Sequence, residues 1–284
     1  SLDACKGIRE EIVNNFLLTE ISFGNFDVFH NANVDTMTIL FTNLKPDSKS
    51  EIIIKEQAKS YEKVISEKIL LQNTITNTNN YKIILKGDGL IDRLSNEKIY
   101  FGKISTICNF YNGIATGPNK ESYFSYQKIN ENYKKLLVGN TIGFYCNNYD
   151  GLFINYDRSK LHRPREEKIF LAAEKIIMQR IRNLKLERRL ICTLDNEQYY
   201  TFNSVNNLLI KENISYSIKY LLALLNSKLL NYIFKKISVN TNITLSDLDC
   251  LPIRLINFDN SNDIRLHDDL VKLVEQMLKA KKEE

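Results

Sequence analysis

Carboxylates that could bind a divalent metal lie in the middle of the chain. Asp150 or Asp157, together with Glu166 and Lys168, fits the Asp…Glu-x-Lys spacing with which some nucleases hold Mg²⁺. Charged residues make up 26% of the chain, so such a spacing arises readily by chance. Glu166 and Glu167 also follow a proline, where acidic side chains suit the first turn of a helix. We therefore favour a helix here and expect no metal site.

The sequence lacks the two motifs that transfer of a methyl group to a base would require. Binding of S-adenosylmethionine needs a glycine-rich turn after a strand. Methylation of a base amino group usually uses an Asn/Asp-Pro-Pro-aromatic tetrapeptide to hold the extruded base, yet no two of the four prolines are adjacent. The histidines His30, His162 and His267 have no nucleophile or ligand near them in sequence. We therefore expect no catalytic residue and no cofactor in this chain.

The five cysteines are far apart and form no Cys-x-x-Cys pair. This spacing offers neither a zinc site nor a disulfide framework, so we expect reduced, buried thiols. No signal-peptide pattern opens the chain, and no apolar run approaches the ~18 residues of a membrane helix. We expect a cytoplasmic protein without a membrane partner. Helical periodicity starts at Ile8 without an initiator methionine, which suggests a piece of a longer protein.

Basic residues concentrate in the stretch 158–189. The net charge of +5 is modest, so the distribution of charge says more than the total. The basic residues of the stretch are Arg158, Lys160, Arg163, Arg165, Lys168, Lys175, Arg180, Arg182, Lys185, Arg188 and Arg189, opposed by only four glutamates. A phosphate backbone would select this asymmetry, and the first four are our candidates for phosphate contact. A solvated strand and helix would explain the charges equally well, and both interpretations stay open for His162.

Three side chains near the end of this stretch could read base edges. Gln179 can pair bidentately with adenine, and Arg180 or Arg182 can pair with guanine. In a strand, neighbouring side chains point to opposite faces, so only one of Gln179 and Arg180 is expected to reach a base.

A second candidate contact is the loop 111–120, which contains two glycines, a proline and short polar side chains. Such a loop exposes backbone N–H groups and allows close approach to phosphate or a base edge. Thr116, Asn119 and Lys120 are its candidate contact residues. An ordinary connection between strands explains the composition nearly as well.

The first part of the chain alternates between the helical and strand periods. We expect a helix over 3–20, strands over 20–23 and 37–41, a strand over 52–54 and a helix over about 56–71. The Asn- and Thr-rich stretch 73–80 predicts a linker, with a domain boundary between 80 and 98.

From residue 98 to 256 the pattern is mostly short strands separated by Gly and Asn turns. The predicted strands are 99–110, 141–146, 151–156, 175–181 and 189–194. One long helix over 216–237 should bury a broad apolar face, and a second helix over 263–282 ends the chain.

Several of these segments, in this order, resemble the TaqI-like C-terminal specificity domain of type IIG restriction-modification enzymes and adenine DNA methyltransferases. The shorter matches are 103–105, 113–119, 135–142 and 174–181. Leu136 and Thr141 stand where the family has Pro and Asp. The most specific match is the "LLALLNS" helix at 221–227 followed by "LSDLDCLPI" at 245–253. Residues 8–12 and 26–36 resemble the end of the family's methyltransferase domain.

The resemblance implies an α+β chain in three parts. These are a small α/β methyltransferase remnant with a linker over 1–95, a mixed α/β target-recognition domain over 96–258 and a C-terminal helix over 259–284. It implies recognition of double-stranded DNA, with the upstream methyltransferase domain of the same protein as a second partner. S-adenosylmethionine, and Mg²⁺ in enzymes that also cleave, would be bound by the parent enzyme. The alternative is a protein-interaction module whose leucine-rich helices form an assembly surface.

Overall fold

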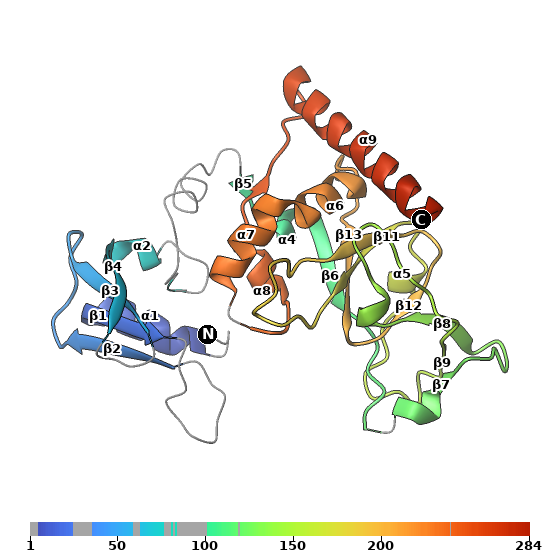
Figure 1. Ribbon diagram of the computed structural model, residues 1–284, viewed down its shortest axis with the longest axis horizontal. Coiled ribbons are helices and arrows are strands. Elements are labelled where there is room, and N and C mark those ends of the chain that lie inside the picture. Colours follow the sequence, from blue (N-terminus) through green and yellow to red (C-terminus); the bar gives the residue numbers. More distant parts are fainter. Residues whose placement is uncertain are drawn as a thin grey trace. The chain divides into compact units, whose positions relative to one another are not determined.

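The computed structural model describes residues 5–24, 36–58, 63–76, 81, 83, 101–118, 120–238 and 240–284. The chain forms two compact units, residues 1–86 and 87–284, which are considered separately. Both contain helices and strands (Figure 1), so the expected α+β class is confirmed. The predicted boundary after residue 95 lies outside the described residues and stays a prediction.

The first unit is a four-stranded sheet in the order β2-β1-β3-β4. Its strands are β1 (Leu17–Gly24), β2 (Thr36–Thr42), β3 (Glu51–Gln57) and β4 (Val64–Leu71), and its helices are α1 (Lys6–Asn15) and α2 (Asn73–Thr76). Only the β1–β3 pair is parallel. The buried Gln72 side chain accepts from the Leu18 N–H and donates to the carbonyls of Val13 and Phe16. It thereby ties the end of α1 to the sheet.

Two helix predictions in this unit are wrong. The helix expected over 3–20 ends at Asn15, because Phe16 is already extended and Leu17 begins β1, where Leu18 and Ile21 enter the core. The segment expected to be helical over 56–71 instead continues β3 and then forms β4, which pairs antiparallel with β3. Pairing with a neighbouring strand outweighed the helical spacing of its apolar residues. The strands predicted over 20–23, 37–41 and 52–54 are confirmed as parts of β1, β2 and β3.

The second unit contains two four-stranded sheets and a two-stranded ribbon. The sheet orders are β11-β10-β13-β6 and β12-β8-β9-β7, and the ribbon is β14-β5. The strands are β5 (Phe101–Gly102), β6 (Cys108–Asn112), β7 (Phe124–Ser125), β8 (Tyr133–Leu137), β9 (Phe153–Asn155), β10 (Lys175–Gln179), β11 (Cys192–Asp195), β12 (Tyr200–Thr201), β13 (Val205–Ile210) and β14 (Ile253–Arg254).

Helices of the second unit connect and flank these sheets. They are α4 (Ile104–Ile107), α5 (Glu167–Phe170), α6 (Ile218–Asn226), α7 (Lys228–Ile237), α8 (Leu245–Leu248) and α9 (Ser261–Glu283), with 3-10 turns at Lys120–Tyr123 and Gly139–Thr141. Helix α9 runs across the outside of α6 (Figure 1) and packs against it. The helix predicted over 263–282 is therefore confirmed. In the part of the chain that the structure describes, no helix is both long and apolar enough to span a membrane.

Strand β8 joins the cores of the two sheets. Leu136 packs with Ile154, Phe170 and Tyr200, whereas its neighbour Leu137 packs in a second cluster with Ile177 and others. Both leucines are fully buried, because successive side chains of a strand point to opposite faces and each face is covered.

The single helix predicted over 216–237 is two helices that meet at Ser227. Ser227 is extended and its side chain accepts from the Leu230 N–H, so the same residue ends α6 and caps α7. Periodicity alone missed this break because apolar residues continue through it.

Two strand predictions of the second unit also need correction. The strand expected over 141–146 is a turn closed by an isolated bridge between Ile142 and Asn147. The strand expected over 99–110 is divided into β5, α4 and β6. The other three predicted strands are confirmed, with shorter bounds, as β9, β10 and β11.

Candidate nucleic-acid interface

Three arginines from two segments lie together near the carboxyl end of β10. Burial lowers the pKa of Arg165, and the positive charges of Arg163 and Arg180 lower it further. Arg165 and Arg163 bond to Gly113 and Ala115, and Arg180 bonds to Asn203 and Ser204. A bridge between Ile114 and Phe202 holds these two segments together. Among the described residues, no carboxylate forms an ion pair with any of the three. We name Arg163, Arg165 and Arg180 the arginine cluster.

Backbone carbonyl oxygens accept hydrogen bonds from two members of the arginine cluster. The Arg165 Nε donates to the Gly113 carbonyl oxygen at 3.1 Å, and the Arg180 Nη1 donates to the Asn203 carbonyl oxygen at 3.0 Å. The Arg180 Nε is buried and has no hydrogen-bond partner among the described residues. Arg163 is exposed, and no described residue accepts a hydrogen bond from its side chain. The cluster therefore retains donors and positive charge for an external anion.

Gly113 lets the loop of residues 113–118 come close to the segment after β12. A side-chain Cβ at this position would lie 2.0 Å from the Phe202 carbonyl oxygen, which leaves no room for any other residue. The Gly113 carbonyl then faces Arg165, and Ala115 exchanges backbone hydrogen bonds with Arg163. The first glycine of the predicted loop thus has a packing role that positions two arginines.

The other predicted loop residues are placed differently. Thr116 is buried, and its hydroxyl contacts the Gly117 carbonyl oxygen at 3.4 Å. Asn119 lies outside the described residues, as does the side chain of Lys120. Contact by these three side chains stays a prediction.

Arg158 and Lys160 lie on the exposed turn that precedes Arg163. The Arg158 Nη1 donates to the Arg165 carbonyl oxygen at 2.9 Å, and Lys160 forms an exposed ion pair with Asp157 at 3.1 Å. The Tyr156 hydroxyl also donates to the Arg165 carbonyl oxygen. This turn therefore supports the arginine cluster and presents further positive charge to solvent.

Gln179 and Arg182 bind each other rather than pointing freely into solvent. The Arg182 Nη1 donates to the Gln179 Oε1 at 2.7 Å, and its Nη2 donates to the Arg188 carbonyl oxygen at 3.0 Å. The Gln179 amide nitrogen donates to the Ile142 carbonyl oxygen. Burial lowers the pKa of Arg182, and its Nε has no partner among the described residues. Both polar ends of the Gln179 side chain are thus occupied within the protein.

Two asparagines of α6 and α7 bind the backbone of residues 189–192, at the end of the basic stretch. Asn226 accepts from the Cys192 N–H and donates to the Cys192 carbonyl, while the Asn231 Oδ1 accepts from the N–H groups of Arg189 and Leu190. Both side chains are buried. The sequence analysis recognised Asn226 only as part of a family motif. Both are polar residues on otherwise apolar helical faces, and this feature of the sequence could have indicated that they bind buried backbone groups.

The carboxylates considered for metal binding do not converge. Glu166 forms an ion pair with Lys168 at 2.6 Å, which lowers the pKa of the Glu166 carboxyl. Asp157 accepts hydrogen bonds from Ser159 and pairs with Lys160. In the described ranges, no group of three or more His, Cys, Asp or Glu residues could hold a metal ion. Glu166 immediately precedes α5 and Glu167 lies in its first turn, in agreement with the helical interpretation.

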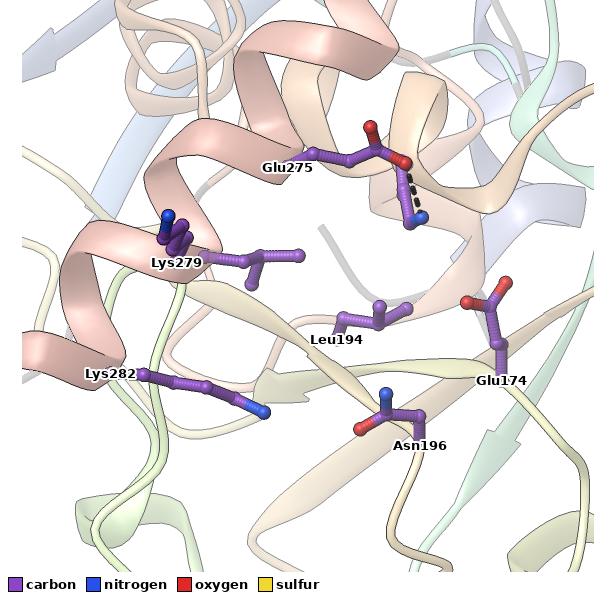
Figure 2. A pocket seen from close by; sticks show the side chains of 8 residues that line it. Glu174, Leu194, Asn196, Glu275, Lys279 and Lys282 are labelled. Carbon is purple, nitrogen blue, oxygen red and sulfur yellow. Dashed lines mark hydrogen bonds and ion pairs between the residues drawn. The ribbon is translucent and has the colours of Figure 1, made fainter.

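A groove lies where α9 passes the end of β11 (Figure 2). Glu174, Leu194 and Asn196 lie opposite Lys282, and Leu278 and Lys279 of α9 also line the groove. Lys219 at its edge pairs with Glu275 at 2.7 Å. Charges of both signs alternate around this groove, so it lacks the uniform positive charge of the arginine cluster.

Comparison with known proteins shows what the region around this interface is similar to. Residues 134–253 match the TaqI-like C-terminal specificity domain. In an alignment of 277 positions that covers 94% of this chain, it is 24% identical to a putative type II restriction enzyme and methyltransferase of Methanocaldococcus jannaschii, of which it spans 23%. The family resemblance seen in the sequence is thus confirmed.

One solved structure has a similar fold, and a second matches more weakly. The type IIL restriction-modification enzyme MmeI, solved in complex with DNA, has a TM-score of 0.50 at 10% identity, covering 95% of this chain and 39% of that one. The type IIG restriction endonuclease BpuSI has a TM-score of 0.45 at 12% identity, covering 95% and 40%. The chain therefore spans less than a quarter of the curated relative and about two fifths of each solved protein.

Proposed function

We propose that the second unit recognises double-stranded DNA as part of a longer restriction-modification enzyme, because residues 134–253 match the TaqI-like C-terminal specificity domain. The observation that carries this proposal is the arginine cluster. Like charges repel, so three neighbouring arginines without a carboxylate partner among the described residues favour a site for an external anion. The repeated phosphates of DNA supply such an anion.

Within this proposal the basic residues divide into three roles. Arg163 and Lys160 are exposed and contact phosphate, with Arg158 beside them. Arg165 is partly buried, and its hydrogen bond to the Gly113 carbonyl fixes the position of its guanidinium within the cluster. Arg180 is the best-placed base-edge reader, because its backbone is fixed by Ser204 and Ile243 and its side chain is partly exposed. Phosphate contacts set the position of the duplex, and base contacts provide the sequence preference.

The chemistry belongs to another part of the longer protein. The curated relative is named a restriction enzyme and methyltransferase, so we propose that the parent enzyme uses S-adenosylmethionine to methylate adenine. Mg²⁺ would be needed only if the parent also cleaves DNA. The first unit, residues 1–86, would then be the end of the methyltransferase domain.

The test is a fluorescence-anisotropy titration of the chain with a pool of random duplex DNA over a salt series. Each lost phosphate contact should reduce the slope of log affinity against log salt by about 0.9. We expect this change for Arg163→Ala, whereas the control Arg265→Ala on the outer side of α9 should bind like the wild type. If alanine at every member of the arginine cluster left affinity and slope unchanged, the proposed interface would be wrong.

A second candidate is an assembly module, and exposed apolar residues on α9 favour it. Leu266, Leu273 and Met277 have exposed fractions of 50%, 55% and 41%. Binding of a protein partner through this face would be independent of salt in the low-to-moderate range, whereas DNA binding would weaken steeply.

A further inference from the structure

The turn between residues 142 and 147 is held in one shape although it contains no regular strand. Ile142 and Asn147 form a bridge, and the Gly143 N–H donates to the Cys146 carbonyl at 2.9 Å. Tyr145 has a φ of +59°, a left-handed conformation that is unfavourable for a bulky residue. Its N–H donates to the Cys192 carbonyl at 3.1 Å, which fixes this conformation against β11. Unfavourable conformations that the surroundings enforce are concentrated at functional sites.

A closed cycle of contacts ties this turn to the basic stretch. Gln179 binds the Ile142 carbonyl, Arg182 binds Gln179, and Arg182 also binds the Arg188 carbonyl. The Arg188 guanidinium then lies over the Phe144 ring, 5.1 Å from the ring centre. The cycle therefore places one aromatic ring and one guanidinium together, at the same end of β10 as Arg180.

The pair of Phe144 and Arg188 has the chemistry of a nucleic-acid contact. Both side chains are partly exposed, and no described residue accepts a hydrogen bond from the Arg188 guanidinium or forms an ion pair with it. An aromatic ring can stack on a base of any sequence, and an adjacent arginine can neutralise a phosphate. Neither residue was a candidate in the sequence analysis, because their pairing depends on contact between segments 44 residues apart.

We infer that the Phe144–Arg188 pair is an additional DNA contact, in which the Phe144 ring stacks on a base exposed by local unstacking and Arg188 binds an adjacent phosphate. Gln179 and Arg182 are positioning residues that hold the turn and the arginine in register. This inference rests on the proposed function and adds a preference for distorted duplex. A duplex with an abasic site exposes such a base without the energetic cost of unstacking an intact pair.

The experiment compares affinities for a random-sequence duplex and for the same duplex carrying one abasic site. The wild type should prefer the abasic duplex about tenfold. Phe144→Leu should lose that preference and bind the abasic duplex about tenfold more weakly, because the stacking contact is lost. Phe144→Tyr should retain both, and Tyr126→Leu, which removes an aromatic residue that is 68% exposed, serves as the matched control.

Arg188 and the positioning residue Gln179 give a second readout. Arg188→Gln should reduce the salt slope by about 0.9, since one phosphate contact is lost. Gln179→Leu should lower the preference for the abasic duplex and broaden the NMR signals of the Phe144 ring, while Arg163 still contributes its full salt slope. Thermal unfolding of each variant identifies any that fail to fold.

The outcomes separate this inference from the proposed function. If Arg163→Ala weakens binding but Phe144→Leu and Tyr126→Leu behave alike, the stacking contact is wrong and DNA recognition stands. If the wild type binds neither duplex at low salt, both are overturned for this chain.

Discussion

The basic stretch 158–189 contains two groups of cations that resemble each other in sequence and differ entirely in surroundings. The inner group, Lys175 and Arg189, is fully buried and bonded within the protein. The outer group is the arginine cluster, which has like charges as neighbours and no carboxylate partner among the described residues. The number of basic residues in this stretch therefore overstates the positive charge that the surface presents to an anionic partner.

Each inner cation has a definite structural partner. Lys175 pairs with Asp195 at 2.5 Å and donates to the Phe170 carbonyl, which joins β10, β11 and α5. Burial lowers the pKa of Lys175, and the charge of Asp195 opposes this shift. Arg189 donates to the carbonyls of Ser238 and Asn240 and lies over the Phe234 ring. These two residues stabilise the fold that carries the outer cluster.

The largest expected effect is loss of the buried ion pair. Lys175→Met should lower the free energy of unfolding by about 3 to 5 kcal/mol, because Asp195 would be left as an uncompensated buried charge. Urea unfolding followed by circular dichroism measures this change. The double variant Lys175→Met, Asp195→Asn should recover part of the loss, and equal stability of the single and double variants would contradict the pairing.

Removal of the Arg189 side chain should have a smaller effect on stability, and it tests whether Arg189 acts separately from the arginine cluster. Arg189→Ala should cost about 2 to 3 kcal/mol, since two buried carbonyls lose their donors and the contact with Phe234 disappears. The salt slope of DNA binding by the folded fraction should stay at the wild-type value. A reduction by about 0.9, as expected for Arg163→Ala, would place Arg189 in the DNA contact and remove the distinction between the groups.

The smallest effect concerns the exposed pair of Glu166 and Lys168. Its hydrogen bond and charge lower the pKa of Glu166 in the folded state, so the contribution to stability is present above about pH 4.5 and is lost as the pH falls through the folded-state value. Glu166→Gln should remove this pH dependence with little change at neutral pH, where the pair is fully exposed to solvent. Unfolding measured from pH 3 to 7 tests it, and a large loss of stability at pH 7 would contradict a solvated pair.

Much of the architecture was readable from short-range patterns. The 3.6-residue spacing of α9 and the β-branched runs of β1, β3 and β10 identified those elements because their apolar faces match their own periods. Segment 64–71 was misread as a helix, because its pairing with β3 is a contact that no local pattern contains. The break at Ser227 was missed for a related reason, since one hydroxyl caps α7 while the apolar spacing continues.

The candidate interface, too, was only partly predictable from the sequence. The residue types that can bind phosphate were evident in the sequence, because arginine and lysine carry their charge wherever they lie. Gly113 was recognisable as part of a loop, although its closeness to Phe202 was not. Gln179 and Arg182 had the chemistry of base readers, yet the structure engages their polar atoms with each other and with the turn at Ile142.

The sequence by itself determined the family resemblance, the α+β class and the stretch of chain that contains the basic residues, since these depend on residue type, order and local period. Tertiary structure alone decided which cations are buried, which three arginines form a cluster, and that Phe144 lies beside Arg188. Burial and pairing depend on contacts between segments distant in sequence, and these contacts determine whether a charge stabilises the fold or remains available for a partner.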